Sequence, residues 1–162
     1  MYGEQNFLMF GEGTFFRDNT RFIELLECFG HKAIVSLHPR RFGKSLFVSI
    51  LNEYYDIKNK NRLNELFDRF WIGKNLTSRA ASFLVLPLDF SNLDITNFTY
   101  FEENFKSKHN HQLNIFLKKY REELGNVPLV DEKSDFVVNF KKICDEIMLK
   151  GFKVRFFCQL LF

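Results

Sequence analysis

Residues 33–47 read Ala-Ile-Val-Ser-Leu-His-Pro-Arg-Arg-Phe-Gly-Lys-Ser-Leu-Phe, and this stretch decides how the rest of the chain is interpreted. Its first part, 33–37, is a short apolar run between polar residues, which is typical of a buried strand. After the loop 38–43, apolar residues recur at helical spacing as far as Tyr54. The pattern predicts a strand, a tight loop and an amphipathic helix in succession.

The loop matches most of the phosphate-binding pattern G-x-x-x-x-G-K-[ST], which joins a strand to a helix. It supplies everything except the first glycine, where His38 stands before Pro39. A residue before proline is steered towards extended backbone, so the chain can leave the strand there without a left-handed glycine. We interpret His38 as a spacer, and a chemical role for its imidazole is the minor alternative.

Each remaining position of the loop has a physical task. Gly43 has no side chain, so backbone N–H groups can close around phosphate oxygens. Lys44 can place its ammonium against the β- and γ-phosphates, and the Ser45 hydroxyl can ligate Mg²⁺, which prefers oxygen ligands. The helix that starts near Lys44 directs its positive end at the same anion. The loop therefore predicts a site for nucleotide and Mg²⁺, with Ser45 as the metal ligand.

Other interpretations of the loop stay open. A Gly-Lys-Ser triplet can be an ordinary helix start with a solvated lysine. Arg40 and Arg41 can each bind phosphate or pair with a carboxylate elsewhere, and we favour Arg41 for the ligand because it is nearer the phosphate. The expected nucleotide-binding residues are Arg41, Phe42, Gly43, Lys44, Ser45 and Leu46.

The composition is that of a soluble globular chain. Its 162 residues are 46% hydrophobic, and 22 of them are phenylalanine, whose rings we expect to fill a core. The 23 basic and 20 acidic residues are too evenly balanced to imply nucleic acid. Three distant cysteines predict neither a disulfide framework nor a zinc ribbon. With no signal peptide and no apolar run of about 18 residues, we expect a cytoplasmic protein without a membrane span.

Strands and helices are expected to alternate along the chain. Strands are predicted over 33–37, 83–90 and 152–157, and helices over 21–29, 46–54, 63–70, 99–124 and 134–149. This alternation predicts an α/β fold with a parallel sheet flanked by helices.

Several helix ends carry signals of their own. Asn19 or Thr20 can cap the first helix, and Thr99 with Glu102 can form a capping box for the long one, which Gly125 closes. On the first helix, one face is expected to carry the apolar residues Phe22, Leu25, Leu26 and Phe29.

One acid and two histidines are candidates outside the loop. Asp89 ends an apolar run, and at the carboxyl edge of a sheet it could hold a metal. Pro87 lies inside that run, however, and Asp-Phe-Ser can simply open a turn, which is the interpretation we favour. His109 and His111 are two apart on a predicted helix, so they face different directions and make a poor metal pair.

Several segments resemble the AAA-ATPase-like family. Residues 39–46, Pro-Arg-Arg-Phe-Gly-Lys-Ser-Leu, are similar to the family's Arg-Pro-Arg-Arg-Phe-Gly-Lys-Ser-Leu loop. Weaker similarities are to its Gly-Ile-Gln-Asp-Phe opening at 2–7, its Val-Asp-Lys-Thr segment at 16–26, its Leu-Phe…Trp-Ile-Gly element at 66–73 and its hydrophobic-Asp-Phe-Ser strand at 87–91. The resemblance spans about residues 2–154.

The resemblance implies a P-loop NTPase-like domain over 1–162 that uses ATP and Mg²⁺, with a divergent tail at 155–162. The family's P-loop domain is often fused to a PD-(D/E)-x-K nuclease-like domain, so a nucleic-acid partner is implied by analogy alone. Two single positions depart from the family, since His38 replaces its usual arginine and Asn19 its lysine.

A larger departure lies at the carboxyl end. The family's next strand should end in Leu-Ile-Asp-Glu-Tyr-Asp, whose acids organise Mg²⁺ and the attacking water. Here Gly-Phe-Lys-Val at 151–154 starts that strand, and 155–162 contain no carboxylate. We therefore expect an amino-terminal fragment, incomplete at its carboxyl end, that binds ATP but lacks catalytic residues for hydrolysis. The alternatives are a nucleotide sensor or interaction module that never hydrolyses, and a non-functional remnant that does not fold stably.

Overall fold

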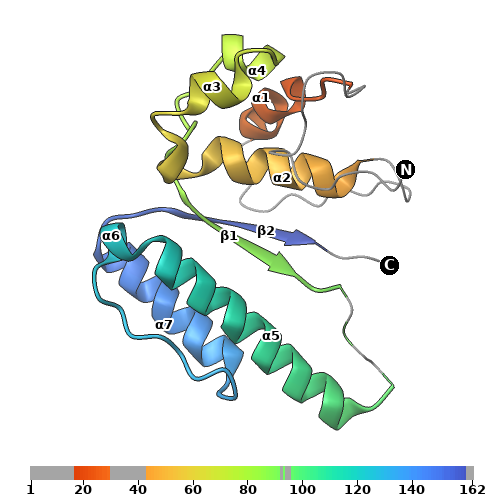
Figure 1. The fold of residues 1–162 in the computed structure, drawn as a ribbon, viewed down its shortest axis with the longest axis vertical. Coiled ribbons are helices and arrows are strands. Elements are labelled where there is room, and N and C mark those ends of the chain that lie inside the picture. The colour runs from red at the N-terminus through yellow and green to blue at the C-terminus, as the bar shows by residue number, and fades with distance from the viewer. Residues whose placement is uncertain (1–16, 30–42, 92, 94–95, 160–162) are drawn as a thin grey trace. The chain divides into compact units, whose positions relative to one another are not determined.

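The computed structural model describes residues 17–29, 43–91, 93 and 96–159 (Figure 1). The predicted strand at 33–37 and the loop residues 38–42 lie outside this part of the chain. The chain separates into two compact units, Met1–Ser82 and Phe83–Phe162.

The described part of the first unit is helical. Its elements are α1 (Arg21–Cys28), α2 (Lys44–Tyr55), the 3-10 helix η2 (Ile57–Asn59), α3 (Leu63–Phe67) and α4 (Trp71–Lys74). The helix predicted over 63–70 is shorter than expected, because Phe70 takes an extended backbone, with φ −102° and ψ 157°, and separates α3 from α4. The helices predicted at 21–29 and 46–54 are confirmed.

A polar clamp joins the segment before α1 to the start of α4. One carboxylate oxygen of Asp18 accepts hydrogen bonds from the N–H and hydroxyl of Thr20, and the other accepts from the N–H of Trp71 at 2.7 Å. The buried Thr20 hydroxyl accepts from the N–H of Ile72 at 3.2 Å. These two side chains therefore satisfy N–H groups that the start of α4 leaves without a helical partner.

Thr20, one of the two residues predicted to cap α1, is its N-cap residue. Its side chain makes no cap bond to that helix, because its hydroxyl is engaged by the clamp. Of the four apolar residues predicted to share one face of α1, Phe22, Leu25 and Phe29 are exposed, whereas the neighbouring Ile23 is fully buried.

A hydrogen-bond network around Glu27 explains the orientation of α1. The Oε1 atom of Glu27 accepts from the hydroxyl of Tyr55 at 2.9 Å and from the hydroxyl of Thr77 at 3.0 Å. Tyr54 in turn accepts from the N–H of Thr77 at 2.9 Å, and burial raises the pKa of the Tyr54 phenol. Because Ile23 lies four residues before Glu27, the network turns both towards the interior.

The second unit contains a parallel strand pair and the helices that connect it. Its elements are β1 (Leu84–Asp89), α5 (Phe98–Lys119), α6 (Arg121–Leu124), α7 (Phe136–Leu149) and β2 (Val154–Gln159). The pairing runs from Leu84 opposite Val154 to Asp89 opposite Gln159. Parallel strands need a long crossover, which α5 and α7 supply as they run side by side (Figure 1). The predicted parallel sheet flanked by helices is confirmed in this unit.

The start of α5 differs from the predicted capping box. Asn97 is the N-cap residue, and its side-chain oxygen accepts from the N–H groups of Thr99 at 2.9 Å and Tyr100 at 3.4 Å. Thr99 is already inside the helix, and Glu102 pairs with Lys106 one turn later. Asn97 takes the N-cap position because its short side chain folds back onto the first turn of the helix.

The end of α5 is fastened to β1 by Tyr120. This fully buried residue separates α5 from α6, with φ −105° and ψ 27°. Its hydroxyl accepts from the N–H of Val85 at 2.9 Å and donates to the Val85 carbonyl at 3.5 Å. The helix predicted to run to Leu124 is therefore broken once, and it closes at Gly125 with φ 71°, as predicted.

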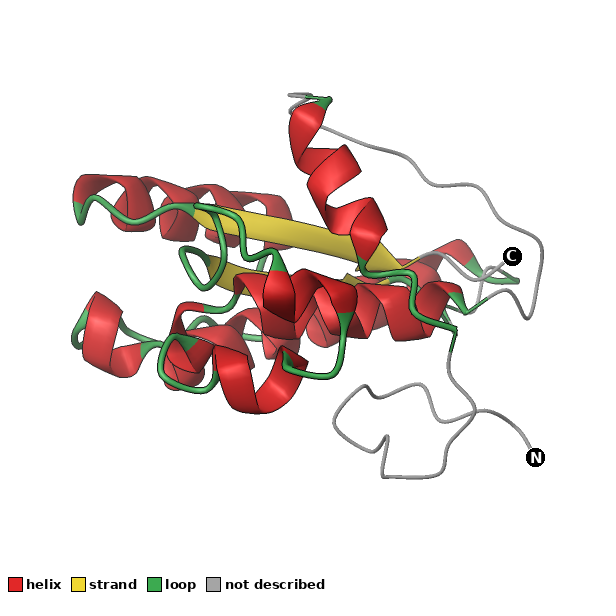
Figure 2. Cartoon of the chain, turned by 90° about the horizontal axis from the view of Figure 1, so that it is seen from above, coloured by secondary structure: helices red, strands yellow, loops and turns green. Residues whose placement is uncertain are grey.

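Asparagines of α5 hold the connection to α7. Asn114 exchanges two hydrogen bonds with the backbone of Val130, at 2.9 and 2.8 Å. Asn110 donates to the Ser134 carbonyl at 2.8 Å. Asp135 then caps α7 by accepting from the N–H of the helix's third residue at 2.9 Å. Figure 2 shows the two strands in yellow and the helices in red.

Gly73 provides a test of packing in the first unit. A Cβ atom at this position would lie 1.8 Å from the carbonyl oxygen of Phe67 and 2.4 Å from its carbon, and backbone cannot yield as a side chain can. We expect Gly73→Ala to lower the free energy of unfolding by about 2–3 kcal/mol. Urea denaturation followed by the fluorescence of Trp71, the one tryptophan in the sequence, measures this loss.

The control for this prediction is Gly43→Ala. No heavy atom of the described residues lies within 4 Å of a Cβ at Gly43, and among these residues only its own φ of 75° opposes the substitution. The expected cost there is about 1 kcal/mol. Equal losses in the two variants would contradict the steric explanation for Gly73.

Candidate functional site

The start of α2 carries four of the predicted nucleotide-binding residues. Gly43 is the N-cap residue and has a left-handed backbone, with φ 75° and ψ 19°. Glycine adopts this conformation without steric strain, whereas other residues adopt it at a cost in free energy. The backbone geometry therefore explains why the motif has a glycine at this position. The helix begins at Lys44, so the backbone turns sharply at the point where the motif requires it.

Lys44, Ser45 and Leu46 form the first turn of α2, and each is half-buried. Further along, the helix is anchored by the buried residues Ile50, Leu51, Tyr54 and Tyr55. The turn is therefore held on a helix of 12 residues whose other end is fixed in the core. Arg41 and Phe42, which were predicted to act with these residues, lie outside the described part of the chain.

The electrostatics of this helix start favour an anion. Helix starts leave N–H groups without an intrahelical acceptor and carry a partial positive charge. Here the N-cap residue is a glycine, no side chain of the described residues forms a cap bond, and the first turn contains Lys44 but no acid. A carboxylate in the first turn would normally balance this positive end. The arrangement can therefore bind an anionic group through backbone and side chain together.

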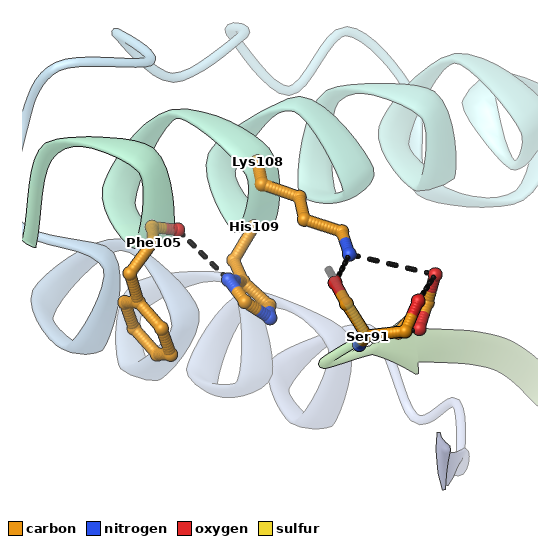
Figure 3. Close-up of polar contacts among 5 residues, drawn as sticks. Ser91, Phe105, Lys108 and His109 are labelled. Carbon is orange, nitrogen blue, oxygen red and sulfur yellow. Dashed lines mark hydrogen bonds and ion pairs between the residues drawn. The ribbon is translucent and has the colours of Figure 1, made fainter. Parts of the chain in front are cut away.

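Asp89 at the end of β1 is engaged in a local network (Figure 3). Its two carboxylate oxygens accept from the N–H and the hydroxyl of Ser91, each at 2.8 Å. Lys108 of α5 lies 3.4 Å from the same carboxylate and donates to the carbonyl of Ser91. Partial burial alone would raise the pKa of Asp89, but the bonds from Ser91 and the Lys108 charge outweigh it and lower that pKa.

The network agrees with the favoured interpretation of Asp-Phe-Ser as a turn. The Asp-x-Ser spacing was the sequence signal for this turn. Lys108 was missed, because its position opposite Asp89 depends on where α5 begins and on which of its faces meets β1. Within the described ranges, no group of three or more His, Cys, Asp and Glu residues could hold a metal ion.

The two histidines of α5 face different directions, as predicted. His109 is fully buried, and its Nδ1 atom lies 2.8 Å from the carbonyl oxygen of Phe105 (Figure 3). His111 is exposed, and its Nδ1 atom lies 2.8 Å from a carboxylate oxygen of Glu132. The burial of His109 was not foreseen, because residues two apart on a helix give no sign of which one faces the core.

The parallel strands and their helical crossover place the chain among α/β proteins. A comparison with protein families narrows this class, because residues 1–153 match the family described as predicted AAA-ATPase. The chain belongs to this AAA-ATPase-like family. The match ends one residue before β2 begins. No curated protein and no solved structure matches the chain.

The length and hydropathy of the described helices bear on whether any of them could cross a membrane. Among the helices that the structure describes, none combines the length and the apolar character that crossing a bilayer requires.

The Asp89 network predicts a pH-dependent contribution to stability. At neutral pH, Asp89→Asn should lower the free energy of unfolding by about 1 kcal/mol, because it removes charge-assisted bonds to Ser91 and Lys108. Since folding lowers the pKa of Asp89, its contribution is complete above the ordinary aspartate pKa of about 3.9 and is lost as the pH falls below it. Urea denaturation at pH 7, 5 and 3.5 measures the difference between wild type and variant.

Asp145→Asn serves as the control, because Asp145 is an exposed carboxylate on α7 of the same unit. Its effect on stability should be close to zero at each pH. A difference between wild type and Asp89→Asn that stayed constant down to pH 3.5 would rule out the ionised carboxylate as its source.

Proposed function

We propose that this chain binds ATP together with Mg²⁺ at the start of α2. The observation that carries the proposal is the left-handed Gly43 followed directly by Lys44 and Ser45 in the first turn of a well-anchored helix. In the proposed complex the phosphates lie against the backbone N–H groups of this turn, where the helix dipole favours negative charge. Arg41, Phe42 and Leu46 are proposed to complete the contacts with the nucleotide.

Lys44 and Ser45 have separate roles in this proposal. The Lys44 ammonium neutralises charge on the terminal phosphates, which backbone dipoles alone do only in part. The Ser45 hydroxyl supplies one oxygen ligand to Mg²⁺, and phosphate oxygens and water supply the rest. Both residues are half-buried, so their side chains can reach a ligand without leaving the helix.

The choice of ATP as the nucleotide rests on the family. Its description as a predicted AAA-ATPase supports adenosine triphosphate as the ligand. The resemblance of the loop 39–46 to that of the family supports the same ligand class. The described residues offer no separate feature that distinguishes adenine from guanine.

We further propose that the chain binds ATP without hydrolysing it. Hydrolysis needs a group that orients the attacking water, a task that the family assigns to acids at the end of a strand. In the described sheet, β2 has the sequence Val-Arg-Phe-Phe-Cys-Gln, and Gln159 lies opposite Asp89. Asp89 itself is occupied by Ser91 and Lys108. The uncharged end of β2 also favours the second candidate function, a nucleotide sensor.

Thermal unfolding with and without Mg-ATP tests the binding proposal. At a hundred times the dissociation constant, ATP should add about 2.7 kcal/mol to the free energy of unfolding, which corresponds to roughly 5–10 °C in Tm. Lys44→Ala should abolish the shift. Lys60→Ala is the matched control, because it removes an exposed lysine of the same unit and should leave the shift unchanged.

Further measurements separate the parts of the proposal. Ser45→Ala should make the shift insensitive to Mg²⁺ while ATP alone still binds weakly. Phosphate release should stay at the level of buffer. Phosphate release that disappears in Lys44→Ala would overturn the proposed lack of hydrolysis, and an unfolding transition unmoved by nucleotide would overturn the proposed site.

A further inference from the structure

His109 of α5 lies in an aromatic box in the second unit. Its ring stacks with Phe105 at a centroid distance of 4.2 Å and with Phe90 at 4.5 Å, both tilted by 35°. Phe136 closes a third side at 5.3 Å. The three phenylalanines come from α5, from the residue that follows β1 and from the first residue of α7. The imidazole therefore lies where three parts of the unit meet.

The hydrogen bonds of His109 define its protonation state. The carbonyl of Phe105 can only accept, so the Nδ1 atom that faces it carries a hydrogen (Figure 3). In the neutral ring Nε2 is then an unprotonated acceptor. This atom is buried and has no hydrogen-bond partner among the described residues. A second proton would therefore convert Nε2 into a buried donor that no described acceptor meets.

The charged groups around the box do not supply that acceptor. Lys108, on the same helix, opposes a positive charge on His109, and Asp89 at the end of β1 favours one. Asp89 is already bonded to Ser91 and Lys108. On the α7 side, Asp135 precedes Phe136, but its carboxylate accepts from the helix backbone. Burial is the largest influence, and the pKa of His109 lies below its ordinary value.

If His109 were protonated, stacking of the imidazolium on the phenylalanine faces would offset part of the free-energy cost of burying its charge. That compensation is available only while Phe90 and Phe105 stay in place, and it leaves the hydrogen on Nε2 without an acceptor. Relief requires water at Nε2, and a movement of Phe90 or Phe136 away from the imidazole would open the box to it. Protonation and opening of the box are therefore coupled.

We propose that His109 is an acid-sensitive lock that joins the segment after β1 and the start of α7 to α5. With neutral His109 the box is closed, and the turn that holds Asp89 and Ser91 is kept against α5. Protonation opens the box and releases Phe90 and Phe136. This proposal does not rest on nucleotide binding at α2, and it makes the order of the carboxyl end of β1 depend on pH.

The direction of the effect follows from linkage. Because folding lowers the pKa of His109, the unfolded chain binds more protons once the pH falls below the ordinary histidine pKa of about 6.5. The lock is therefore complete above that pH and weakens as the pH falls below it.

Hydrogen exchange followed by mass spectrometry on the full chain tests the lock at pH 7.5 and pH 5.5, after correction for intrinsic exchange rates. In wild type, peptides that cover 90–109 and 136–143 should exchange at least about threefold faster at pH 5.5. His109→Phe should remove this pH dependence, because its ring cannot be protonated. His111→Gln, which changes the exposed histidine two residues away, should retain it.

NMR of ¹⁵N-labelled histidine in wild type gives a second measurement that needs no variant. His109 should show the neutral Nδ1–H form at pH 7.5, and it should gain its second proton over the same pH range in which the peptides lose protection. Equal exchange at both pH values would overturn the proposal. So would pH dependence that persists in His109→Phe, or an imidazolium signal from His109 while the peptides stay protected.

Discussion

Helix starts leave N–H groups that need a hydrogen-bond acceptor, and the fold of this chain depends on which groups accept from them. Asp18 and Thr20 accept at the start of α4, and Asn97 and Asp135 accept at the starts of α5 and α7. The start of α2 differs from these three, because its N-cap residue is Gly43, which has no side chain to offer. The starts of α1, α3 and α6 also have no side-chain cap bond among the described residues, but only at α2 does the family resemblance expect a phosphate. The candidate site is thus a helix start whose balancing anion would come from a ligand.

The second unit is organised by a different requirement, the connection between its two parallel strands. Parallel strands cannot be joined by a tight turn, so β1 and β2 require the crossover that α5 and α7 provide. Tyr120 fastens one end of α5 to β1, and Asn114 fastens its second half to the following loop. At the middle of α5, Lys108 and the box around His109 hold the turn after β1. The crossover is therefore tied at several points along its length.

Much of this fold could be predicted from sequence, because element type follows local periodicity. The positions of β1, β2 and the longer helices, the end at Gly125 and the family were all predicted correctly. What failed depended on distant partners, as with Thr20, whose hydroxyl bonds a residue 52 positions away. The expectation that phenylalanine rings fill the core holds only in part, since several phenylalanine side chains are exposed. In the candidate site, Gly43 has the left-handed backbone that the motif calls for. The nucleotide-binding roles of Gly43 and of Arg41, Phe42, Lys44, Ser45 and Leu46 remain predictions.

The bond between Tyr120 and Val85 has a consequence for how the sheet can grow. In a parallel strand both backbone groups of one residue point to the same side, and the side alternates along the strand. Val85 and Pro87 therefore present the same border of β1, and Tyr120 occupies that border at Val85. Two residues on, the proline has no hydrogen to donate. A foreign strand approaching from that side would find the Tyr120 phenol at Val85 and a tertiary amide without a hydrogen at Pro87. It could not form a continuous ladder of hydrogen bonds there, which protects β1 against fibre-like self-association.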